Sequence, residues 1–168
     1  MPPMTTAARV PRRRPARRWA LLPAAAALGT LFVVPSTQVE HKDDAFISAQ
    51  TTGILLIEGG ECFSDPAYSP VAGEPVVVYT PCADGADNQS YGFVHAADGP
   101  WDRASVAAFG WRGCEEMFAR RWPGEAASGL GFYPILPTAE TWADGDRDIM
   151  CAVYEPGGRL SGSLLPLA

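Results

Sequence analysis

The chain has 168 residues, enough for one ordinary domain and too few for a large multi-domain enzyme. Its 17 Gly and 16 Pro make turns frequent and argue against a coiled coil or long helices beyond the N-terminus. The formal net charge is −6, yet six arginines precede residue 19 and all 19 acidic residues follow residue 39. The chain after residue 39 is therefore strongly acidic and repels the phosphates of nucleic acid, so DNA and RNA are not expected partners.

The N-terminus indicates the compartment. Residues 1–18 are basic, and residues 19–39 carry no charge. The positive-inside pattern predicts that 1–18 are cytoplasmic and that the chain beyond about residue 40 is outside. The apolar run is close to membrane-spanning length and lacks an Ala-x-Ala cleavage site, so we favour an uncleaved single-pass anchor at the cell membrane. The alternative is a cleaved signal segment and a secreted protein. Residues 40–51 are expected to form a linker and residues 52–168 the extracytoplasmic domain.

The elements of this domain follow from its hydrophobic periodicity. Apolar runs bounded by turn residues predict strands at 54–57, 75–79, 91–95, 132–136 and 149–154, with a hairpin return at 160–164. From Asp102 apolar residues recur at spacings of three and four, which predicts one amphipathic helix ending before Pro123. Gly110 and Gly113 lie within that helix and are expected to allow close packing against the sheet.

A second, single helical turn is expected after residue 137, capped by Thr138 and running through Trp142. The predicted fold is therefore a small α+β domain. One main amphipathic helix packs on a mostly antiparallel sheet, and a single N-terminal hydrophobic helix precedes them.

Four cysteines, Cys62, Cys82, Cys114 and Cys151, all follow the apolar segment. An even number in an oxidising compartment predicts two disulfides, and three pairings are possible. We favour sequential pairing, because the first pair flanks one strand-and-loop unit and the second joins a helix to a strand. The absence of a Cys-x-x-Cys spacing argues against a zinc site, so neither a metal nor a cofactor is expected.

Local motifs give no catalytic residue. Acidic residues at 144, 146 and 148 resemble the start of a calcium loop, but Ile149 stands where the loop needs glycine and a predicted strand follows. Ser161 and Ser163 lack the glycines of a nucleophile elbow. The tryptophans at 101, 111, 122 and 142 could line a glycan groove, although core packing is the commoner role of such residues.

Residues 60–164 resemble the septum-formation domain family of actinobacterial envelope proteins. The most specific block is 137–151, which holds Trp142, Gly145, Asp146 and Arg147 in the family's spacing; further matches include 60–63, 76–82 and the 160–164 segment with Gly162 and Ser163. We expect these motif residues to be structural. The loop 83–90 departs from the family pattern, since it has no His and has Gln89 near the acidic position, so the resemblance assigns it no role.

The resemblance implies an extracytoplasmic domain linked to cell division and transfers no catalytic residue. We therefore expect a non-enzymatic, membrane-tethered domain that binds an envelope or division protein, or a cell-wall polymer. Two alternatives stay open. One is a cell-wall hydrolase, because glycosidic chemistry needs only two carboxylates. The other is a purely structural secreted envelope protein.

Overall fold

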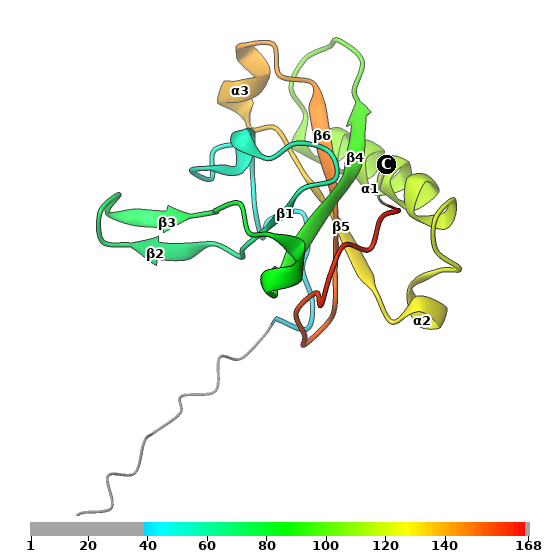
Figure 1. The fold of residues 1–168 in the computed structure, drawn as a ribbon. Helices are drawn as coiled ribbons and strands as arrows, with labels where there is room; N and C mark the ends of the chain where they lie inside the picture. The colour runs from blue at the N-terminus through cyan, green and yellow to red at the C-terminus, as the bar shows by residue number, and fades with distance from the viewer. Residues whose placement is uncertain (1–38, 167–168) are drawn as a thin grey trace, which may run out of the picture. The chain divides into compact units, whose positions relative to one another are not determined.

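A four-stranded antiparallel sheet forms the centre of the computed structural model, which describes residues 39–166 (Figure 1). Its strands lie in the order β1-β4-β6-β5, with bounds Cys62–Phe63 for β1, Asn88–His95 for β4, Asp148–Tyr154 for β6 and Gly131–Ile135 for β5. Every pairing is antiparallel. The predicted α+β class and antiparallel sheet are thus confirmed for this part of the chain.

The main helix α1, Arg103–Ala119, packs on one face of the sheet (Figure 1). Asp102 caps it by accepting a hydrogen bond from the backbone N–H of Ala104. A Cβ atom at Gly113 would lie 2.8 Å from Cγ1 of Val94, and one at Gly110 would lie 3.1 Å from Cγ2 of Ile149. Both glycines therefore permit the close approach of helix and sheet that the sequence predicted.

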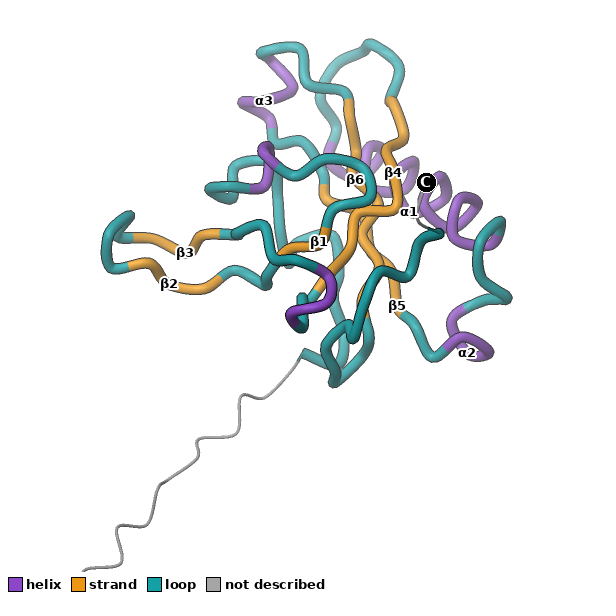
Figure 2. The backbone as a smooth tube through the Cα atoms, in the orientation of Figure 1, coloured by secondary structure: helices purple, strands orange, loops and turns teal. Residues whose placement is uncertain are grey.

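The opposite face of the sheet is covered by the segment from Lys42 to Ile57, which is mostly loop (Figure 2). Ile47 in this segment is 1% exposed. Asp44 ties the segment to α1, because its carboxylate accepts a hydrogen bond from Trp111 Nε1 at 3.2 Å and pairs with Arg103. Residues 40–51, predicted to be a linker, thus belong to the fold, which begins before Thr52.

Residues 54–57 form no strand. Ile54–Leu56 is a 3₁₀ helix, η1, which follows Gly53 at a φ of 92°. A short apolar run has the same pattern in a strand and in a buried helical turn, and here the glycine begins a turn.

A two-stranded ribbon, β2 (Ala67–Ser69) and β3 (Glu74–Val76), extends away from the main sheet (Figure 1). The predicted strand at 75–79 is only partly formed, because β3 ends at Val76. The chain then turns into the core, where Val77 is buried and its N–H donates to the Thr52 carbonyl. Exposed apolar side chains lie on and after the ribbon, at Tyr68, Val71, Val78 and Tyr79.

Besides η1, the structure has the short helices η2 (Cys82–Asp84) and α2 (Glu125–Ser128), which were not predicted, and a further short helix that was predicted. This last helix, α3 (Ala139–Ala143), begins at the predicted cap, because the Thr138 and Thr141 side chains form a capping box.

The predicted return strand at 160–164 is wrong, since these residues form a loop (Figure 2). Strand β6 already pairs with β4 on one side and β5 on the other, so the chain after it finds no free edge.

Both predicted disulfides form with the favoured sequential pairing. Cys62–Cys82 joins β1 to η2, and Cys114–Cys151 joins α1 to β6. Between residues 39 and 166 no helix has the length and apolarity to cross a membrane. The hydrophobic helix predicted at 19–39 lies, except for its last residue, outside the residues that the structure describes.

Candidate functional site

The loop that carries the most distinctive motif is held by Trp142 and Arg147. Trp142 is buried, and its indole Nε1 donates to the Gly99 carbonyl at 2.9 Å. The Arg147 guanidinium lies 3.9 Å from the Trp142 ring centroid and donates to the Trp142 carbonyl at 2.7 Å. Its Nε also pairs with Asp98. These contacts support the structural role expected for both residues.

Gly145 and Asp146 complete the turn between α3 and β6. Gly145 has a φ of 95°, a conformation that favours glycine. The Asp146 N–H donates to the Thr141 carbonyl, and its Oδ1 accepts from the Asp148 N–H at 3.1 Å. The motif thereby fixes two carboxylates, Asp146 and Asp148, at the start of β6.

These two carboxylates line a groove of about 200 Å³ whose other lining residues are apolar. We call it the acidic groove; its residues are Ala49, Ile54, Leu55, Ile57, Phe93, Ile135, Asp146, Asp148 and Met150. Leu55 is 70% exposed and Phe93 42% exposed, although both are large apolar side chains. The predicted motif is therefore placed beside an apolar surface that sequence reasoning did not identify.

The charge of the acidic groove is negative. Asp148 Oδ1 lies 2.8 Å from Nδ1 of His95, within hydrogen-bond distance, and both side chains are exposed. No lysine or arginine lines the groove. An apolar surface beside two carboxylates is complementary to a partner segment in which an apolar side chain lies next to a lysine or arginine.

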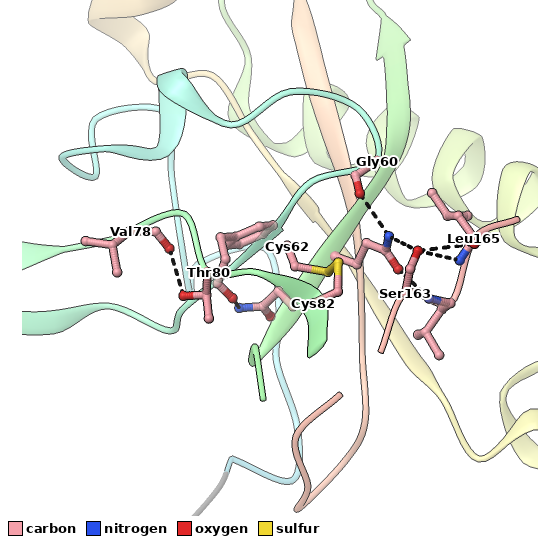
Figure 3. Close-up of a disulfide and its surroundings, with 11 residues drawn as sticks. Gly60, Cys62, Val78, Thr80, Cys82, Ser163 and Leu165 are labelled. Atoms are coloured by element: carbon pink, nitrogen blue, oxygen red, sulfur yellow. Dashed lines mark hydrogen bonds between the residues drawn. A yellow bond between two sulfur atoms is a disulfide. The ribbon is translucent and has the colours of Figure 1, made fainter. Parts of the chain in front are cut away.

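The segment 160–164, which contains Gly162 and Ser163, is held by Gln89; residues 88–90 of the predicted loop 83–90 belong to β4. Gln89 is completely buried, and its Nε2 donates to the Gly60 carbonyl at 2.9 Å and to Ser163 Oγ at 2.8 Å. Its Oε1 accepts from the Leu164 N–H at 2.7 Å. Figure 3 shows Gly60 and Ser163 beside the Cys62–Cys82 disulfide. Gly162 precedes this contact and has open space around its Cα.

Replacing Gln89 with leucine is expected to lower the free energy of unfolding by about 1–3 kcal/mol, because buried partners of the amide lose their hydrogen bonds. Urea denaturation followed by tryptophan fluorescence measures this change. The matched variant Ser163→Ala removes one of the three Gln89 bonds together with the exposed hydrogen bonds between Ser163 and the Leu165 backbone, and should cost less. Equal stability of Gln89→Leu and the unmodified protein would contradict the role given to this amide.

A buried polar cluster lies between the N-terminal segment and the sheet. The side chain of Lys42 is 3% exposed, and its Nζ lies 2.5 Å from Asp65 Oδ1 and 2.9 Å from Asn88 Oδ1. Burial lowers the pKa of the Lys42 ammonium group, while Asp65 opposes the shift. No local pattern predicts this cluster, because Lys42 lies among charged residues in the predicted linker and its partners are far along the chain.

The remaining candidates are structural. All four cysteines are in disulfides, and the four tryptophans considered for a glycan groove pack against or within the core. Within residues 39–166 no group of three His, Cys, Asp or Glu residues could hold a metal ion. The calcium-like segment after Asp148 is strand β6.

Comparisons of the chain with models of known protein families, with characterised proteins and with solved structures find no match.

Proposed function

We propose that the folded domain is a non-enzymatic, extracytoplasmic module, held at the cell membrane by residues 19–39, that binds an envelope protein through the acidic groove. The observation that carries the proposal is the exposure of Leu55 and Phe93 beside Asp146 and Asp148. The partner segment would insert an apolar side chain and place a lysine or arginine against the carboxylates.

The link to septum formation rests on the motif resemblance. The residues that carry it, Trp142 to Arg147, form the loop that presents Asp146 to the groove. The most specific part of the resemblance and the proposed binding surface thus lie in one place, which supports a shared role.

The tether would keep the folded domain attached to the bilayer through a short connection. Seven residues, 35–41, separate the end of the continuous apolar run from the buried Lys42. Fully extended they would span at most about 25 Å.

Site-specific cross-linking in dividing cells tests the proposal. A photo-activatable amino acid at Leu55 or Phe93 should link to one reproducible envelope protein, whereas the same group at Val71 on the ribbon or Glu116 on α1 should not. Links only from Val71 or Glu116 would contradict the site. Links from the groove to glycan strands would contradict the choice of a protein partner.

The substitution Asp148→Asn should reduce the cross-link from Leu55 by about two- to fivefold, because one charge contact at an exposed site is worth roughly 0.5–1 kcal/mol. Raising the salt concentration should weaken the link further, since screening acts over about 8 Å at physiological ionic strength. Glu116→Gln on α1 is the matched control and should change nothing. An unchanged yield for Asp148→Asn would show that the carboxylate does not contribute.

The rival hypothesis is a cell-wall hydrolase that uses the groove carboxylates. A glycosidase needs one carboxyl group kept protonated by an apolar environment, whereas Asp148 is exposed and paired with His95. Turnover of purified peptidoglycan that disappears in the Asp146→Asn and Asp148→Asn variants would establish the hydrolase and overturn the binding proposal.

A further inference from the structure

The buried cluster around Lys42 brings an amine, a carboxamide and a carboxylate into mutual contact. Lys42 Nζ lies 2.9 Å from Asn88 Oδ1 and 2.5 Å from Asp65 Oδ1. The same Asp65 oxygen accepts a hydrogen bond from Asn88 Nδ2 at 2.9 Å. These three residues come from the N-terminal segment, the start of β4 and the loop after β1, so the fold assembles them.

We propose that Lys42 and Asn88 become joined by an intramolecular isopeptide bond. The free amine of Lys42 attacks Cγ of Asn88, the bond between Nζ and Cγ forms, and the bond between Cγ and Nδ2 breaks. The departing nitrogen takes up the proton that the amine first gave to Asp65 and leaves as an ammonium ion. No oxidant, reductant or other co-reactant is needed.

The carbonyl of Asn88 is placed for such an attack. Its Oδ1 accepts a hydrogen bond from the Tyr133 hydroxyl at 2.9 Å as well as from Lys42. Asn88 and Tyr133 are completely buried, and burial raises the pKa of Tyr133 well above its ordinary value, so this hydroxyl keeps its proton. Tyr133 therefore stabilises the negative charge that develops on Oδ1 as the amine adds to Cγ.

Asp65 is placed to carry the protons. It contacts both the nitrogen that must lose protons and the nitrogen that must gain them. Of the three protons on the Lys42 ammonium group, one stays on the new amide nitrogen. The other two leave with Nδ2 as an ammonium ion, and Asp65 ends ionised as it began.

The apolar surroundings of Lys42 and Asn88 favour isopeptide formation over hydrolysis of the carboxamide. The rings of Phe46 and Tyr154 lie 5.2 and 4.9 Å from Lys42 Nζ. Burial increases the share of free amine and keeps water away from Asn88 Cγ, which limits hydrolysis of the carboxamide. The product also replaces a buried ammonium ion by a neutral amide.

The bond would join residues 46 apart in the chain and fasten the N-terminal segment to β4, the strand beside β6 at the centre of the sheet. A mechanical force applied to the residues preceding Lys42 would then be transmitted to the sheet through a covalent bond. This consequence is independent of which partner occupies the acidic groove.

Mass spectrometry of the full-length protein, denatured, reduced and alkylated, tests the proposal. Cleavage after glutamate places Lys42 in peptide 41–58, Asp65 in 62–74 and Asn88 in 75–115. We expect 41–58 and 75–115 to be linked, with a combined mass lower by one ammonia molecule. Unlinked peptides would overturn the proposal and leave a buried ion pair. A link from 41–58 to 62–74 with loss of water would overturn the assignment of Asn88.

Two variants define the role of Asp65. Asp65→Asn keeps the shape of the side chain and removes its base, so the linked fraction soon after synthesis should fall at least about tenfold. Asp43→Asn, which alters an exposed carboxylate next to Lys42 in the sequence, should link fully. Full linkage in Asp65→Asn would contradict its role as proton carrier. The unmodified protein decides whether the bond exists, even if a variant fails to fold.

Discussion

Removing the Cys114–Cys151 bridge with the double substitution Cys114→Ala and Cys151→Ala is expected to lower the free energy of unfolding by about 2–5 kcal/mol. Both cysteines are completely buried, and the bridge is a covalent connection between α1 and the central strand β6. Its loss frees the unfolded chain and leaves a gap in the main core. Urea denaturation of the two proteins measures the difference.

The Cys62–Cys82 bridge supplies the matched control. It spans 20 residues rather than 37 and joins β1, at the edge of the sheet, to a short helix. The loop lengths alone predict a difference of about 0.5 kcal/mol between the bridges, and core packing should increase it. A larger loss from the Cys62–Cys82 variant would contradict this ranking. The single substitution Cys114→Ala should in addition leave Cys151 as a titratable thiol after unfolding.

The elements predicted best are those whose pattern is local. Helix α1 follows apolar spacings of three and four, strand β6 is a continuous apolar run, and turn residues bound both. Thr138 begins α3 through a capping box formed within one turn. The hairpin return after residue 158 failed for a non-local reason. Whether that segment pairs depends on the free edges of β6, and those depend on the order of strands far apart in sequence.

In the candidate site, too, local features could be predicted from the sequence and contacts between distant segments could not. The loop from Trp142 to Arg147 could be predicted as a structural motif, because its contacts lie mostly within the loop itself. The acidic groove could not, since Leu55 and Phe93 reach it from segments distant in the chain. The Lys42 cluster was hidden for a further reason. A lysine flanked by His41 and Asp43 has the composition of a solvated linker, and only the fold shows that it is buried.

The N-terminal segment therefore has more importance than its composition suggests. Residues 42–57 cover one face of the sheet, supply Lys42 to the buried cluster and supply Leu55 to the acidic groove. This segment lies against the chain after β3, where the Val77 N–H donates to the Thr52 carbonyl and Gly53 faces the Val77 carbonyl.

Replacing Gly53 with alanine is expected to lower the free energy of unfolding by about 3 kcal/mol or more. A Cβ atom there would lie 2.0 Å from the carbonyl oxygen of Val77, a backbone atom, and the φ of 92° is unfavourable for any residue with a side chain. Because η1 follows directly, the displacement should also move Leu55 away from the acidic groove. Urea denaturation and the cross-link from Leu55 measure the two effects separately.

The control variant Gly73→Ala separates two effects of Gly53→Ala: the steric clash of the new Cβ atom with Val77, and the backbone strain of a positive φ. Gly73 has a φ of 75°, but a Cβ atom there would meet nothing within 4 Å, so only the strain of the left-handed conformation should be felt, about 1 kcal/mol. Both substitutions remove a glycine from the unfolded chain in the same way. The excess loss in Gly53→Ala therefore measures the contact between the N-terminal segment and Val77. Equal losses at the two positions would mean that this segment yields without cost, and the groove it borders would then not be a fixed surface.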